Sequence, residues 1–167
     1  MACGTLADRT HAGEDRVRER LVRRILMSSS RLSNAAIVFV APDARKTAAY
    51  YRDVLGFRIV EHYDKAEPFA SLYRDTVEII VVQAKFGSVV SNTGRYGAGY
   101  DAYLDPEDVA GVDVLYTELK EKGAVIESPP AMTPYGSYEF VVEDIDGRRI
   151  GIGRIKEEGV FFKDANL

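Results

Sequence analysis

The fold is decided by one stretch of sequence, AIVFVAPDARKTAAYYRDVLGF, which spans residues 36–57. Its first six residues are apolar and rich in β-branched and aromatic side chains, which is typical of a buried strand. Asp43 follows Pro42 and is placed to cap a helix over residues 44–55. Gly56 then stands where a left-handed helix end is favoured. The stretch therefore predicts a strand, a helix and a return toward the sheet.

The order of elements that begins in this stretch occurs twice along the chain. Strand-like runs follow at 57–63, 69–74 and 77–83, and a glycine-rich break follows at 85–99. A second strand is expected at 100–104, and a helix at 107–122, with Asp105 as cap and Pro106 at its first position. Further strands are expected at 124–127, 138–143 and 149–155. These runs predict an α+β fold of two β-α-β-β-β units.

The expected organisation has four parts. Residues 34–156 form the domain, with its halves at 34–84 and 100–156 and a linker at 85–99. Residues 157–167 form a C-terminal tail, and residues 1–33 form a basic extension, partly helical or disordered. In that extension, Val17, Leu21 and Ile25 are spaced as in an amphipathic helix over 14–27, which would dock on a partner or remain solvated. Met27 is an alternative start of the functional chain.

The composition excludes several classes of protein. The 167 residues include one cysteine, Cys3, so neither a disulfide framework nor a cysteine metal site is expected. No apolar run approaches the ~20 residues that cross a bilayer, and no secretory leader is recognisable, so a cytoplasmic protein is expected. The net charge is −4, and residues 1–30 hold six arginines against four acids, so the body is acidic. Nucleic-acid binding is therefore not expected of the body.

Three motifs resemble those of the vicinal oxygen chelate superfamily, in particular its bleomycin-resistance-like branch. They are YYRDVLGF (50–57) after Asp43, LYTEL (115–119) before Gly123, and YGSYEF (135–140) followed by DIDG (144–147). The superfamily includes glyoxalase I, extradiol dioxygenases and bleomycin-resistance proteins. The resemblance implies two βαβββ modules that form a concave mixed sheet with helices on its outer face. It also implies a homodimer, in which two chains commonly build the ligand cleft.

The metal enzymes of this superfamily hold a divalent ion with histidine and glutamate ligands, and the matching positions of this chain carry none. The resemblance places the first histidine at Ala36 and the final glutamate at Gly151, while residues 100–104 include no histidine. His62 lies outside these positions and His11 lies in the extension. One imidazole in the body cannot replace three ligands. No metal and no cofactor are expected.

Strand alternation predicts which side chains face the cleft. Val38 and Val40 share a face with Ala36, and Glu139 shares one with Gly151 and Gly153. Glu78 is expected on the matching face of the first half. Small residues at the ligand positions are expected to leave space. The expected ligand-binding residues are Val38, Tyr73, Glu78, Tyr100, Tyr135, Glu139 and Gly151.

Glu78 and Glu139 are the candidate acids. Each has a structural interpretation, as an edge-strand charge or a hydrogen-bond partner of Tyr or Arg, and a functional one, as a cleft carboxylate of raised pKa. Tyrosines beside an acid would suit an aromatic or cationic small molecule. The first hypothesis is metal-independent binding of such a ligand, at a dimer interface. The alternatives are a lyase, isomerase or related enzyme with a cleft glutamate as acid/base, and a regulatory or interaction module that uses the N-terminal helix.

Overall fold

The computed structural model describes residues 34–163. Of these, residues 36–163 belong to one compact unit. The expected N-terminal helix and the alternative start at Met27 lie outside the described residues, as do the last four residues of the tail.

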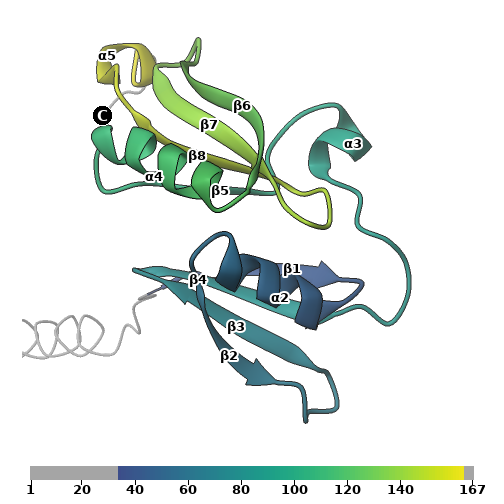
Figure 1. The fold of residues 1–167 in the computed structure, drawn as a ribbon. Helices are drawn as coiled ribbons and strands as arrows, with labels where there is room; N and C mark the ends of the chain where they lie inside the picture. The colour runs from purple at the N-terminus through teal and green to yellow at the C-terminus, as the bar shows by residue number, and fades with distance from the viewer. Residues whose placement is uncertain (1–33, 164–167) are drawn as a thin grey trace, which may run out of the picture. The chain divides into compact units, whose positions relative to one another are not determined.

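The first half of the unit forms a four-stranded mixed sheet with one helix. Its elements are β1 (Ile37–Ala41), α2 (Ala44–Asp53), β2 (Arg58–His62), β3 (Phe69–Arg74) and β4 (Val77–Gln83). The strand order is β1-β4-β3-β2, with β1 parallel to β4 and the other pairs antiparallel. We call this sheet A (Figure 1).

The second half repeats this topology in a separate sheet, which we call sheet B. Its elements are β5 (Ala102–Leu104), α4 (Ala110–Glu121), β6 (Val125–Met132), β7 (Ser137–Glu143) and β8 (Arg149–Ile155). The order β5-β8-β7-β6, again with one parallel pair, matches that of sheet A. The predicted α+β fold of two βαβββ modules is thus confirmed. A short helix α3 (Asn92–Tyr96) lies in the segment interpreted as a linker, and α5 (Glu158–Phe161) follows β8.

The two long helices begin differently. The Asp43 side chain accepts a hydrogen bond from the backbone N–H of Lys46 at 3.0 Å, as the sequence predicts for the cap of α2. The predicted start of α4 is wrong, because this helix begins at Ala110 rather than after Asp105. The Asp108 carboxylate instead accepts from the backbone N–H of Gly111 at 2.8 Å. That bond satisfies a donor of the first turn, which has no partner inside the helix.

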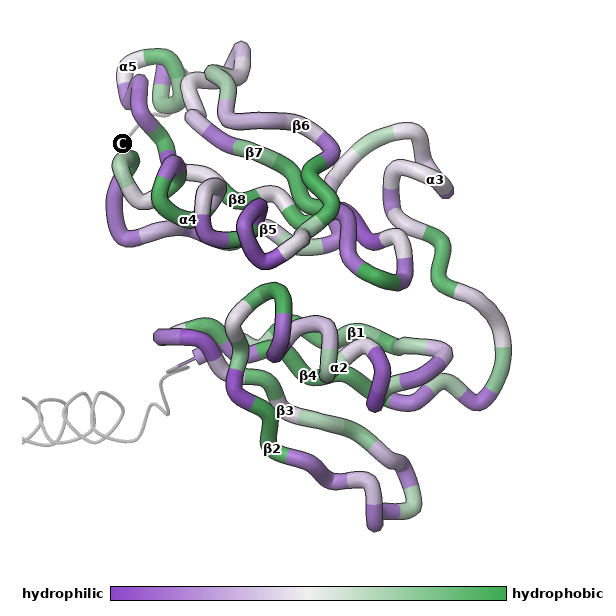
Figure 2. Tube along the Cα trace, in the orientation of Figure 1, coloured by the Kyte–Doolittle hydropathy of each residue, from purple (hydrophilic) through white to green (hydrophobic). Residues whose placement is uncertain are grey.

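The helix-facing sides of both sheets share one hydrophobic core. Alternate strand residues point to it from each half, among them Phe39, Leu72 and Ile79 from sheet A and Phe140 and Ile150 from sheet B. Figure 2 shows the hydrophobic segments of β3, β4, β7 and β8 that contribute to it. Burial of this apolar surface supplies the main stabilisation of the unit.

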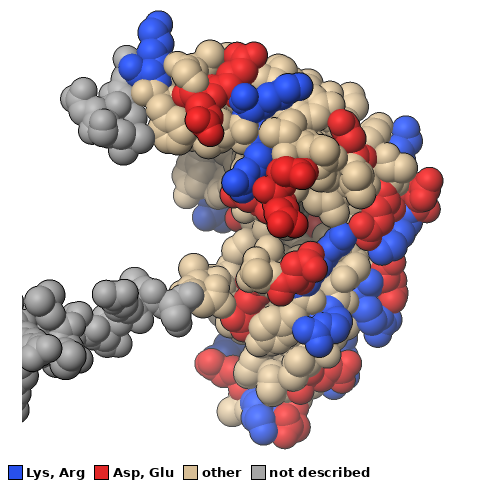
Figure 3. Space-filling model, turned by 90° about the vertical axis from the view of Figure 1, so that its left-hand side faces the viewer, with Lys and Arg blue, Asp and Glu red and all other residues tan. Residues whose placement is uncertain are grey.

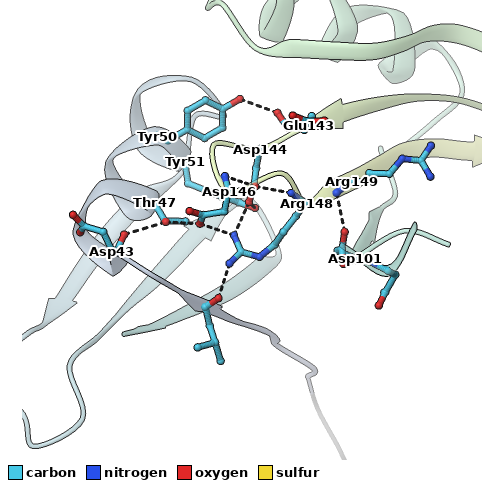
Figure 4. Close-up of polar contacts among 12 residues, drawn as sticks. Asp43, Thr47, Tyr50, Tyr51, Asp101, Glu143, Asp144, Asp146, Arg148 and Arg149 are labelled. Atoms are coloured by element: carbon cyan, nitrogen blue, oxygen red, sulfur yellow. Dashed lines mark hydrogen bonds and ion pairs between the residues drawn. The ribbon is translucent and has the colours of Figure 1, made fainter. Parts of the chain in front are cut away.

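A buried arginine joins the two halves through polar contacts (Figure 4). The Arg148 guanidinium lies 2.8 Å from both Asp144 and Asp146, and it donates to the backbone carbonyl oxygen of Val40 at 2.6 Å. From α2, the Tyr51 hydroxyl donates to Asp144 at 3.0 Å and the Thr47 hydroxyl donates to Asp146 at 2.6 Å. Every member of this network has a partner, so the charges are buried without an unsatisfied group.

Each sheet turns its other face away from the core. On sheet A this face carries Val38 and Val40, which are 59% and 55% exposed while Phe39 between them is buried. On sheet B it carries Glu139 and Val141, since they pair across the strands with Gly153 and Gly151. We call these two surfaces the open faces. The predicted alternation of inward and outward residues is confirmed on both sheets.

Candidate ligand-binding site

Three tyrosine hydroxyls converge on one carboxylate on the open face of sheet B. Tyr100 and Tyr135 donate to Oε1 of Glu139 at 2.5 and 2.7 Å, and Tyr103 donates to Oε2 at 2.8 Å. The Tyr103 hydroxyl also lies 2.8 Å from the Ser137 hydroxyl. Glu139 itself is only 5% exposed, whereas Tyr135 is 46% exposed. We call these five residues the tyrosine–carboxylate cluster.

Sheet pairing brings the cluster together from separate parts of the chain. Glu139 lies on β7, an inner strand of sheet B, so it is not the edge-strand charge of the structural interpretation. Tyr103 lies on β5, directly opposite Gly151 of β8. Tyr100 immediately precedes β5, and Tyr135 lies in the turn before β7. The alternative that Glu139 is a hydrogen-bond partner of tyrosine is confirmed.

Two glycines of β8 make room for the tyrosine rings. A Cβ atom on Gly151 would lie 2.8 Å from the Tyr103 ring and 2.9 Å from the Tyr100 ring. A Cβ atom on Gly153 would collide with the Cβ atom of Glu139 and lie 2.5 Å from the Tyr103 hydroxyl oxygen. The expectation of empty space over these small residues is therefore wrong, because aromatic rings occupy it.

The cluster holds Glu139 as a carboxylate. Burial raises the pKa of this carboxyl, but the hydrogen bonds from Tyr100, Tyr135 and Tyr103 lower it, and the net pKa is below the ordinary value. The raised pKa expected from the sequence is thus wrong for Glu139. A hydrogen-bonded carboxylate of low pKa is a weak base and a stable negative charge.

The tyrosines of the cluster remain protonated donors. Burial raises the pKa of Tyr100 and Tyr103 well above the ordinary range, and the hydrogen bonds to Glu139 raise it further. Burial and Glu139 also raise the pKa of Tyr135. One negative charge surrounded by neutral hydroxyls is consequently the stable state near neutral pH.

The other candidate residues lie on the open face of sheet A. Tyr73 of β3 donates to Glu78 of β4 at 2.8 Å, again as the structural interpretation expects. Val38 lies on β1, the edge strand beside β4. His62 stacks on Phe69, with ring centroids 4.5 Å apart. Glu78 and Glu139 therefore belong to different sheets, each with its own tyrosine partner.

The residues present do not fit the divalent ion of the superfamily's metal enzymes. Within residues 34–163, no group of three histidine, cysteine or acidic side chains is arranged to hold a metal ion. Gly151, at the position where the resemblance expects a glutamate ligand, supplies no donor atom and is covered by tyrosine rings. Both oxygens of Glu139 already accept hydrogen bonds. The donor atoms of this site therefore support no chemical step through such an ion.

One face of the described surface carries mixed charge (Figure 3). Acidic and basic side chains are interspersed over the face that Figure 3 presents. Among the helices of the described residues, none is long and apolar enough to cross a membrane.

Two members of the cluster are missing from the sequence prediction, Tyr103 and Ser137. Alternation along β5 carries the signal for Tyr103, because its neighbour Ala102 is buried in the core. The pairing of Tyr103 with Gly151 is what gives the residue its place, and that register cannot be read from a short strand.

Comparison with known proteins gives one family. Residues 35–152 match the Glyoxalase/Bleomycin resistance protein/Dioxygenase superfamily. A comparison with curated proteins finds no match.

Solved structures with the same fold share little sequence with the chain. A glyoxalase/bleomycin resistance protein/dioxygenase from Nocardioides is 18% identical, with a TM-score of 0.59, over 85% of this chain and 95% of that one. A glyoxylase/bleomycin resistance protein/dioxygenase domain from Frankia sp. EAN1pec is 18% identical, with a TM-score of 0.60, over 76% and 100%. Lactoylglutathione lyase from Agrobacterium tumefaciens is 18% identical, with a TM-score of 0.55, over 75% and 95%. With residues 35–152 matched, the chain belongs to the Glyoxalase/Bleomycin resistance protein/Dioxygenase superfamily.

Proposed function

We propose that this protein binds a small organic molecule over the tyrosine–carboxylate cluster, without a metal ion, and that it does so as a homodimer. The second copy covers the open faces and closes the site. The bleomycin-resistance-like branch, which works by binding, is the part of the superfamily that this proposal favours.

The observation that carries the proposal is the placement of the cluster. A nearly buried carboxylate without a cationic partner is costly, even with hydrogen bonds. The hydrophobic core lies on the opposite side of sheet B and does not include Glu139. Three aromatic rings and a fixed charge on a face turned away from the core support a ligand-binding role for this face.

Exposed apolar side chains on sheet A support the proposal that a second copy of the chain binds there. Val38 and Val40 of β1 and Val60 of β2 are all about half exposed and lie on its open face. Single exposed valines are ordinary, but several on one sheet face indicate a contact surface. Because the resemblance to the superfamily implies a homodimer, we take a second copy of the chain as the partner.

The low pKa of Glu139 favours binding over acid/base catalysis. A general base works best with a pKa near the working pH, and the hydrogen bonds of Tyr100, Tyr103 and Tyr135 move the pKa of Glu139 the other way. Binding requires no such base. The lyase or isomerase alternative is correspondingly weaker for this carboxylate.

A thermal-shift screen of small aromatic compounds in the presence of EDTA tests the binding proposal. We expect at least one compound to raise the Tm of the full chain, and Tyr103→Ala to abolish that rise. Tyr96→Ala, which removes an exposed tyrosine outside the cluster, should preserve it. A response that requires added Zn, Ni, Mn or Fe would overturn the metal-free site.

Light scattering tests the dimer separately. We expect twice the 18.5 kDa chain mass for the wild type and a monomer for Val40→Glu. Val114→Glu changes a more exposed valine on α4 and should leave the dimer intact. A monomeric wild type would overturn the shared site.

A further inference from the structure

We infer that the ligand is an organic cation, with an ammonium group next to an aromatic or apolar body. This inference rests on the proposed function and names the class of molecule that the tyrosine–carboxylate cluster selects. Its basis is the charge balance of the cluster and the orientation of the tyrosine hydroxyls.

Among residues 34–163, none supplies Glu139 with a cationic partner. Its hydrogen-bond donors are the hydroxyls of three tyrosines, which are neutral. Within the described part of the chain, none of the ion pairs includes this carboxylate. By contrast, the buried Asp144 is paired with Arg148 at 2.8 Å. The cluster therefore keeps one negative charge that a ligand can neutralise.

The tyrosines extend the negative potential of Glu139 toward the surface. A hydroxyl that donates its proton to a carboxylate becomes a better acceptor on its remaining lone pairs. The ring faces also carry negative potential, and Tyr103 and Tyr135 keep a third or more of their surface exposed. An ammonium group is attracted by both the hydroxyl oxygens and the rings.

The guanidinium of Arg149, which lies over the Tyr100 ring, does not reverse this preference. Arg149 lies over the Tyr100 ring, with its Cζ atom 5.5 Å from the ring centroid. Its Nε donates to Glu127 at 2.6 Å, and its Nη1 donates to Thr93 at 2.6 Å. The Arg149 charge is therefore balanced by Glu127, and the charge of Glu139 is left over. An anionic ligand would meet that charge, and the one guanidinium beside it that the described residues show, Arg149, is already paired with Glu127.

Three probes that share a phenylethyl group and differ in its polar end test the inference: 2-phenylethylammonium, 2-phenylethanol and 3-phenylpropionate. Their affinities for the full chain are measured by titration calorimetry at neutral pH in EDTA. We expect the ammonium probe to bind about tenfold more tightly than the alcohol, and the carboxylate to bind weakest. Glu139→Gln should remove the difference between the ammonium and the alcohol. Glu121→Gln, which neutralises an exposed acid of α4 away from the open faces, should keep it.

If Glu139→Gln does not fold, a second pair of variants still tests the cation preference. Tyr135→Ala removes a half-exposed ring and should weaken the ammonium probe about fivefold, whereas Tyr135→Phe keeps the ring and should retain most of the affinity. Equal binding of all three probes at the cluster would overturn the cation preference and leave the proposed function standing. Binding of none of them would overturn both.

Discussion

The hydroxyl of Tyr100 lies 2.5 Å from a carboxylate oxygen of Glu139, although the two residues are 39 positions apart in the chain. The contact exists because β5 and β7 lie on either side of β8 in sheet B. Gly151 of β8 leaves the space over the strand that the Tyr100 ring fills. The topology of the second module thus builds the cluster from residues that are separate in sequence.

Removal of the Tyr100 hydroxyl should destabilise the protein. Tyr100→Phe leaves one oxygen of a nearly buried carboxylate with one donor fewer, which should lower the free energy of unfolding by about 1.5–3 kcal/mol. Chemical denaturation measures the change. Tyr96→Phe, at an exposed tyrosine outside the cluster, should leave it unaltered. An equal effect of both variants would contradict the role given to the Tyr100 hydroxyl.

The stability contributed by Glu139 should depend on pH. Its pKa is lowered in the folded protein from an ordinary value of 4.5, so the contribution is present above that pH and disappears as the pH falls through the lower folded value. The Tm difference between wild type and Glu139→Gln should therefore shrink from neutral pH to about pH 3. A difference that grew on acidification would show that the pKa is raised.

The hydrogen bonds and ion pairs of Arg148, which link the two halves, should contribute strongly to the free energy of unfolding. Arg148→Ala leaves the buried Asp144 and the partly buried Asp146 without their cation, which should lower the free energy of unfolding by about 3–5 kcal/mol. Arg52→Ala breaks an exposed ion pair with Asp53 and should have no measurable effect. Denaturation curves of the two variants decide this, and similar midpoints would contradict the assignment.

Gly153 should tolerate no side chain. Gly153→Ala would bring its Cβ atom into collision with Glu139 and the Tyr103 hydroxyl, so we expect a loss of about 1–3 kcal/mol in the free energy of unfolding. A Cβ atom on Gly159, in α5, would meet no atom within 4 Å. Gly159→Ala should therefore be neutral or slightly stabilising. A Tm for Gly153→Ala as high as that of Gly159→Ala would show that the ring packing is loose.

Local chemistry accounts for the elements that the sequence predicts correctly. The alternation of apolar residues and the turn at Asp75 give the bounds of β3 and β4 as observed, and Asp43 caps α2. The start of α4 is predicted wrongly because Pro106 is buried. Tertiary packing, rather than the preference of proline for the first turn of a helix, decides the place of this residue. The predicted end at residue 127 is too early for β6, an edge strand that continues through Pro129.

The sequence predicts which residues form the candidate site better than it predicts their contacts and their pKa values. Glu139, Tyr100 and Tyr135 can be named from alternation and from their place near the strand ends. Their mutual contacts depend on the register between β5, β8 and β7, which is a property of the folded sheet. The same register decides that Glu139 has a lowered pKa, because three hydroxyls reach it.

The most direct test of the central claim is an NMR titration of the full chain carrying ¹³C-labelled tyrosine rings, in EDTA, with the three phenyl probes. We expect at least one probe to shift the ring signals of Tyr100, Tyr103 and Tyr135 together. The rings of Tyr50 and Tyr63, outside the cluster, should stay unchanged. Shifts confined to other tyrosines, or shifts that appear only after a divalent metal is added, would contradict a metal-free ligand site on the open face of sheet B.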